Sequence, residues 1–98
     1  MLDESKFTFD FYYPNRGHAN EKTLCYVYHK QELDEWRQLL RGARDREDRT
    51  EYDIIKGSKP KPIVITQAIC DERDNFCKKT GRIKARGRAI SYLIRNGY

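Results

Sequence analysis

The clearest chemistry in this chain lies in its last quarter. The segment from Asn75 to Gly97 has no Asp or Glu and contains seven cations: Lys78, Lys79, Arg82, Lys84, Arg86, Arg88 and Arg95. The helical spacing of its apolar residues predicts one amphipathic helix. A helix with so much unbalanced positive charge attracts phosphate, whether in a nucleotide, in nucleic acid or on an acidic partner. The segment therefore predicts an anion binder.

The predicted helix has two unlike faces. At about 100 degrees per residue, one face gathers Phe76, Ile83, Gly87, Ile90 and Ile94, and we expect this face to pack on a sheet. The opposite face carries Gly81, Ala85, Ala89 and Tyr92. Small residues at that spacing would allow a second protomer or a flat ligand to approach closely, or they reflect the helix propensity of alanine. Cationic side chains lie on both flanks.

The remaining elements must position this helix. Alternation of apolar and polar residues predicts strands over Lys6–Tyr13 and Thr23–His29, and a β-branched run predicts the strongest strand over Ile63–Cys70. A helical pattern covers Glu32–Ala43, and Thr50–Ile55 is predicted as a short strand. The order is ββαββα, which corresponds to an α+β domain with about four mainly antiparallel strands.

The ends of the last helix have their own signals. Asp71–Asp74 reads as an acidic turn, and Asp74 or Asn75 can cap the helix by accepting from free backbone N–H groups. Gly97 suits a C-terminal cap.

Composition limits the class of protein. The chain has 98 residues, so residues 1–98 are expected to form a single small domain. Residues 1–50 hold nine Lys and Arg against ten Asp and Glu, and residues 51–98 hold eleven against five, so the positive charge lies in the second half. No signal peptide or membrane-spanning run is visible, which predicts a cytoplasmic protein. Three cysteines do not suit a disulfide framework.

Catalytic and metal chemistry are weakly supported. A nucleophile site from Cys25 with His18 or His29 would lack an orienting group. The acids of the turn, Asp71, Glu72 and Asp74, could bind Mg²⁺ in a nuclease, but such a turn before a helix is more typical of a cap. Phosphate-loop and nucleophile-elbow motifs are absent from the sequence. We therefore expect no enzyme activity, no cofactor and no metal.

One stretch resembles a known family. The run Asp74–Arg82 (DNFCKKTGR), followed by Ala85, Arg88 and Ala89, resembles the strand-then-helix ending of small bacteriophage proteins, in particular the first type of anti-Thoeris protein. The resemblance covers about 25 residues. It implies a small homo-oligomeric sponge that sequesters a cyclic nucleotide or cyclic ADP-ribose-type immune signal without cleaving it, in the cytoplasm of the bacterial host.

The resemblance also implies site residues. Phe76, Arg82 and Arg88 are carried over by position, as an aromatic near a base and arginines on phosphates. Asn75 and Arg86 are added from helix geometry, and Arg16 in the first turn is a further predicted contact.

Three other functions remain open. A nucleic-acid-binding module would use the same cations with Tyr12, Tyr13, Tyr26 and Tyr28 as stacking surfaces. A protein inhibitor of a host defence complex, of the anti-CRISPR type, would dock its basic surface on an acidic or RNA-lined partner. A nuclease would use the acidic turn.

Overall fold

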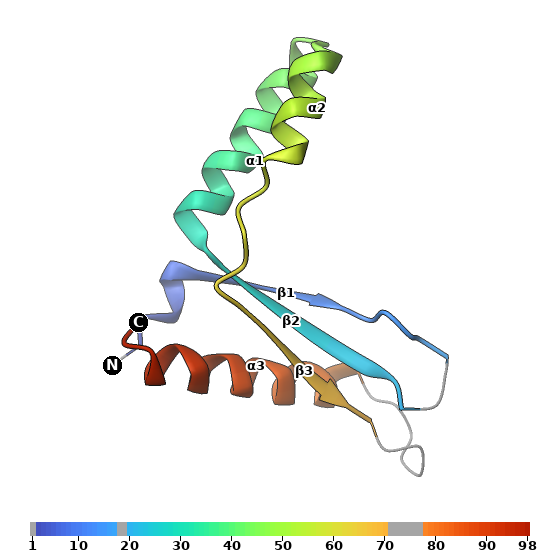
Figure 1. Cartoon of the computed structure of the whole chain (residues 1–98), viewed down its shortest axis with the longest axis vertical. Helices are drawn as coiled ribbons and strands as arrows, with labels where there is room; N and C mark the ends of the chain where they lie inside the picture. The colour runs from blue at the N-terminus through green and yellow to red at the C-terminus, as the bar shows by residue number, and fades with distance from the viewer. Residues whose placement is uncertain (1, 18–19, 71–77) are drawn as a thin grey trace.

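The computed structural model describes residues 2–17, 20–70 and 78–98. Its elements follow the order η1 (Glu4–Lys6), β1 (Phe7–Tyr12), β2 (Lys22–His29), α1 (Lys30–Asp45), α2 (Arg49–Gly57), β3 (Val64–Ile69) and α3 (Lys78–Arg95). The three strands form an antiparallel sheet in the order β1-β2-β3, with α3 along one face (Figure 1). The α+β class and the three strongest predicted strands are confirmed.

The register of the sheet agrees with the alternation of side chains along the predicted strands. β1 pairs with β2 from Phe7↔His29 to Tyr12↔Leu24, and β2 pairs with β3 from Lys22↔Ile69 to Val27↔Val64. Phe7, Cys25 and Val27 share one core cluster with α3. The rings of Tyr12 and Tyr26 meet edge to face at 4.7 Å, on the other face of the sheet, because side chains alternate along each strand.

The predicted strand at Thr50–Ile55 is wrong, because these residues lie inside α2. The Asp48 side chain caps α2 by accepting from the Glu51 N–H at 3.0 Å. Tyr52 and Ile55 are partly buried one helical turn apart, and the Trp36 indole N–H donates to the Ile55 carbonyl at 2.7 Å. Packing against α1 thus selects a helix, so the order is ββααβα and the described part of the sheet has three strands.

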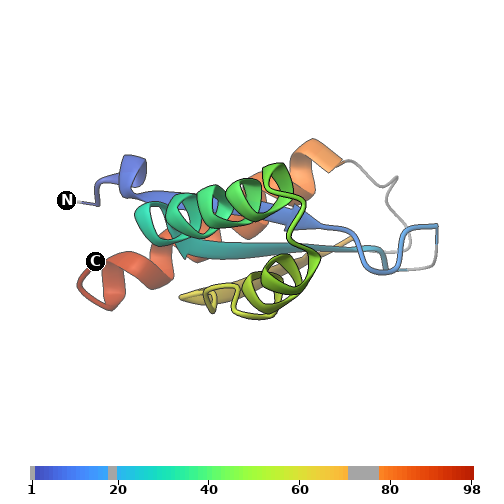
Figure 2. The same ribbon diagram turned by 90° about the horizontal axis from the view of Figure 1, so that it is seen from above.

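Helices α1 and α2 form an antiparallel hairpin that projects from one end of the sheet (Figures 1 and 2). Leu33 and Ala43 are its buried residues, and Trp36 is half-buried between the two helices. The molecule is flat as a result, with extents of 50 × 36 × 16 Å.

The predicted orientation of α3 is also wrong. Its buried residues are Ala85, Ala89 and Leu93, which lie on or beside the face expected to point away from the sheet. Ile83 and Ile94, expected in the core, are 62% and 60% exposed. Phe76, the first residue of the expected core face, lies outside the described residues.

Close contact with the sheet explains this reversal. A Cβ at Gly81 would lie 2.2 Å from Thr23 Oγ1, and the Thr66 hydroxyl donates to the Ala85 carbonyl at 2.6 Å. The backbone of α3 therefore lies too near the strands for an isoleucine to fit between them. Small residues on the helix meet small residues on the strands, and the small-residue face is used inside the protomer.

The end of α3 confirms the predicted cap at Gly97, which has φ of +79°. The Tyr98 N–H donates to the Leu93 carbonyl at 3.0 Å and the Gly97 N–H donates to the Ile94 carbonyl at 3.2 Å. This pair of bonds is the Schellman motif. Among the described helices, none is both long and apolar enough to cross a membrane.

Candidate anion-binding site

The exposed side of α3 has an apolar centre between two rows of cations. We call Ile83, Gly87, Ile90 and Ile94 the crest. Lys79, Arg82 and Arg86 form the β1 flank, which faces β1, and Lys84, Arg88 and Arg95 form the β3 flank, which faces the outer strand β3. Two depressions adjoin the crest, one on each flank, and the described residues that line each of them include three cations and no carboxylate.

The depression on the β1 flank exists because α3 packs over β2 and β3 rather than over β1. The inner side of β1 is left partly open, and Phe11 forms the base of a shallow hollow of about 450 Å³. Its lining is Phe11, Lys79, Arg82, Ile83, Arg86, Gly87 and Ile90. An aromatic ring beside three cations can receive a planar base together with its phosphates.

Arg86 is held in place by two contacts. Its guanidinium carbon lies 5.0 Å from the centre of the Phe9 ring, and the same group forms an ion pair with Glu4. Both charged side chains are close to half exposed, so water screens the pair and its contribution to stability is small. A phosphate with two oxygens for the guanidinium fork can compete with Glu4 for this arginine.

Arg82 and Lys78 meet the end of β1 at Tyr13. Arg82 donates to the Tyr13 hydroxyl at 3.4 Å, and the Lys78 ammonium lies 5.1 Å from the centre of the same ring. Neither contact supplies a negative charge. Arg82 and Arg86 are four residues apart and lie on the same side of α3, so both can reach one anion in the β1-flank depression.

Arg88 has a different position from the other two arginines. It donates to the backbone carbonyl of Gln67, in the outer strand β3. The depression beside it is lined by Ile83, Lys84, Gly87, Arg88, Ser91 and Arg95. No aromatic residue is among them, so this side offers charge without a stacking surface.

The structure thus divides the predicted site residues. Arg82 and Arg86 lie together, whereas Arg88 lies across the crest. Arg16 is exposed in the turn after β1 and lines neither depression. Asn75 and Phe76 lie outside the described residues.

Two residues of the β1-flank depression were missed, namely Phe11 and Lys79. Alternation along β1 correctly placed Phe11 on the inner side of the sheet. No sequence signal showed that α3 would leave that end of the strand uncovered.

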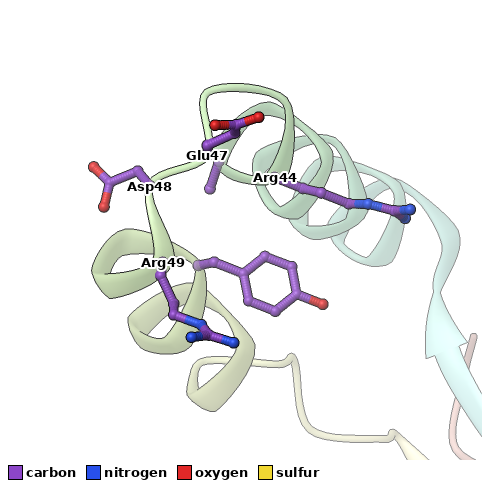
Figure 3. Close-up of a pocket in the computed structure, with 6 residues that line it drawn as sticks. Arg44, Glu47, Asp48 and Arg49 are labelled. Carbon is purple, nitrogen blue, oxygen red and sulfur yellow. The ribbon is translucent and has the colours of Figure 1, made fainter.

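The tip of the α1–α2 hairpin holds a hollow of another character (Figure 3). Ala43, Arg44, Glu47, Asp48, Arg49 and Tyr52 line it. The lining includes two cations and two carboxylates, and Asp48 already caps α2. Its charges balance, so this hollow has no preference for an anion.

Of the residues that could have formed a nucleophile site, His18 lies outside the described residues, and the positions of Cys25 and His29 do not support such a site. Cys25 is fully buried, and burial raises the pKa of its thiol to about 11. It is therefore a protonated core residue at neutral pH rather than a thiolate. The exposed His29 ring packs against Phe7 and Tyr98, with centroids 5.8 Å away in both cases.

In the part of the chain that the structure describes, no three His, Cys, Asp or Glu side chains gather, and the acidic turn Asp71–Asp74 lies outside the described residues. Comparisons of the chain with protein-family models, with curated proteins and with solved structures give no match.

Proposed function

We propose that this protein is a non-catalytic binder of a phosphate-bearing nucleotide and that the β1-flank depression is its site. The observation that carries the proposal is the lining of that depression, where Lys79, Arg82 and Arg86 adjoin the Phe11 ring, and Glu4, the carboxylate paired with Arg86, is not among the described lining residues. The cations would hold phosphate oxygens and the ring would contact the base. The hollow has the volume of sites that bind small molecules, about 300–1,000 Å³.

Sequestration rather than turnover fits the chemistry of this lining. Among the described residues that line the depression, none is a carboxylate, histidine or cysteine, the groups that most often act as general acids, bases or nucleophiles. Arginine and lysine stay charged at neutral pH and bind phosphate as fixed donors. The ligand would therefore leave as it entered.

The resemblance to anti-Thoeris proteins narrows this proposal. It would make the ligand a cyclic nucleotide or cyclic ADP-ribose-type immune signal, and the protein a phage-encoded sponge acting in the bacterial host. Self-association belongs to the same proposal. The exposed Ile83 of the crest borders both depressions, and a second copy that covered the crest would enclose the bound ligand.

Calorimetry against a panel of cyclic di- and trinucleotides and cyclic ADP-ribose isomers tests the proposal. We expect one ligand to bind in a fixed ratio and to be recovered intact after heating. The double variant R82A/R86A should weaken binding at least tenfold, because each arginine loses a charge-assisted bond. The matched control K84A/R95A removes two cations from the other flank and should change affinity much less. Equal losses in the two variants would reject the site.

Nucleic acid is the second candidate, because the cations continue across both flanks of the exposed helix. The positions of three tyrosines argue against the base stacking that the sequence suggested. Tyr12 and Tyr26 lie on the face of the sheet away from α3, and Tyr28 is buried. Binding to a short RNA or DNA duplex that falls steeply with salt would favour this candidate over an enclosed nucleotide.

A further inference from the structure

The outer edge of β3 presents backbone groups that no described strand pairs with. The Cys70 N–H donates to the Glu21 carbonyl at 2.8 Å, and the register pairs Ala68 with Thr23. Along a strand of an antiparallel sheet, the backbone N–H and C=O groups of successive residues point alternately to one side of the strand and to the other. The N–H and C=O groups of Ile65, Gln67 and Ile69 therefore point away from β2, as the bond from Arg88 to the Gln67 carbonyl bears out.

This edge lacks the usual protection against strand addition. β3 reads VITQAI, without a charge, a proline or a glycine. Natural edge strands carry such residues because an unguarded edge pairs with other chains. The opposite edge of the sheet differs, since β1 carries a charged residue, Asp10, which lies 3.7 Å from Arg37. Of the two edges, β3 is the one open to a partner.

The surroundings of the edge define which partner would fit. On the face away from α3, Ile65 and Ile69 are 49% and 50% exposed. On the face towards α3 lies the β3 flank, whose depression has three cations and no carboxylate among its described lining residues. A strand placed beside β3 would thus meet apolar side chains on one face and positive charge on the other.

We propose that the β3 edge receives an extended acidic segment of a partner protein as a fourth strand of the sheet. Its backbone would pair with Ile65, Gln67 and Ile69. Its alternate side chains would be carboxylates towards Lys84, Arg88 and Arg95, and apolar groups beside Ile65 and Ile69. Main-chain bonds supply affinity in this mode of recognition and alternate side chains supply specificity.

Charge decides between this partner and a second copy of the chain. Pairing β3 with itself would bring two β3 flanks towards each other, three cations from each protomer, and like charges repel. An acidic strand instead neutralises them. Arg88 links the two states, because an incoming N–H would replace it at the Gln67 carbonyl and release its guanidinium for a carboxylate.

The test uses a nine-residue peptide in which glutamate alternates with valine. We expect saturable binding in calorimetry. Hydrogen exchange followed by NMR should show new protection at the Ile65, Gln67 and Ile69 amides, whereas the Thr66 and Ala68 amides are already paired. A lysine–valine peptide of equal length should bind at least tenfold more weakly. The same holds for a glutamate–valine peptide whose β3-facing amides are N-methylated.

Two variants sharpen the result. Gln67→Pro removes an N–H that the pairing with β2 does not use, and it should weaken the glutamate–valine peptide at least tenfold. R82A/R86A should leave that peptide unaffected, which separates this surface from the nucleotide site. Binding that survives N-methylation would show simple charge attraction and overturn the proposal. So would failure to bind, or a concentration-dependent dimer that protects the same three amides.

Discussion

The inner and outer sides of α3 carry the opposite kinds of side chain from those of a typical helix that packs on a sheet. Its inner side carries Gly81, Ala85 and Ala89 before the larger Leu93, and all of it is buried or nearly so. Its outer side carries three isoleucines between two rows of cations. The order of side-chain size is thus reversed, with small residues inside and large apolar residues outside.

The contrast shows that the short distance between the backbone of α3 and the strands, rather than the apolar area of the side chains, decides which side of α3 meets the sheet. The bond from the Thr66 hydroxyl to the Ala85 carbonyl and the approach of Gly81 to Thr23 require a backbone nearly in contact with the strands. The isoleucines displaced to the outside leave exposed apolar surface among cations. Such surface on a small protein is typical of an interaction site, so the outer side is the one where function is expected.

Two adjacent residues near the end of α3, one on each side of the helix, test this contrast, and we expect them to give the largest difference in stability. Leu93 is fully buried and Ile94 is 60% exposed. We expect Leu93→Ala to lower the free energy of unfolding by about 2–5 kcal/mol, because it leaves a cavity in the core. Ile94→Ala should stay within about 0.5 kcal/mol. Urea denaturation measures both, and similar losses would show that the sides have been assigned wrongly.

The next largest effect is on the pH dependence of stability, and it comes from the thiol of Cys25, which lies below the inner side of α3. The folded-state pKa of Cys25 is about 11, against an ordinary value of 9.0. Between these values the unfolded chain releases a proton that the folded protein keeps, so stability is complete below pH 9 and falls as pH rises towards 11. The loss reaches about 2–3 kcal/mol at about 1.4 kcal/mol per pKa unit.

Other groups titrate in the same range, so the prediction concerns a difference. Urea unfolding at pH 8 and at pH 10.5 should show a steeper loss in the wild type than in Cys25→Ala. Parallel losses would mean that the thiol is accessible to water in the folded state.

Several features of the fold followed directly from the sequence. Alternation along Lys6–Tyr13 and Thr23–His29 correctly predicted the strands β1 and β2, because successive residues of a strand point to opposite sides of the sheet. The glycine at position 97 gave the helix end, since φ of +79° suits glycine. Both rules depend on neighbours along the chain, which a sequence contains in full.

The errors came from contacts between distant segments. Thr50–Ile55 forms a helix because Tyr52 and Ile55 pack on α1. The orientation of α3 was predicted wrongly because the face expected to meet the sheet was chosen by the hydrophobicity of its residues. The approach of Gly81 to Thr23 joins segments far apart in the sequence. The candidate site was affected in the same way, since Arg82 and Arg86 were correctly paired by helical spacing but the role of Phe11 depends on where α3 crosses the sheet.

Gly81 gives a direct test of how near the inner side of α3 lies to the strands. Adding one methyl group as Gly81→Ala places a Cβ 2.2 Å from Thr23 Oγ1, so the helix or the strand must shift. We expect a loss of about 1–3 kcal/mol in the free energy of unfolding. Thr23→Ala removes the nearest of the clashing atoms, and the double variant should recover part of the loss. Strict additivity of the two changes would argue against direct contact.

Gly87 is the counterpart of Gly81 on the outer side and gives the smallest effect, with the opposite sign. A Cβ at Gly87 would meet nothing within 4 Å. Gly87→Ala should therefore raise the free energy of unfolding by about 0.4–1 kcal/mol, because alanine restricts the unfolded chain and favours the helix. Thermal unfolding measures the gain. Since Gly87 borders both depressions, we also expect the stabilised variant to bind the nucleotide more weakly, and unchanged affinity would remove Gly87 from the site.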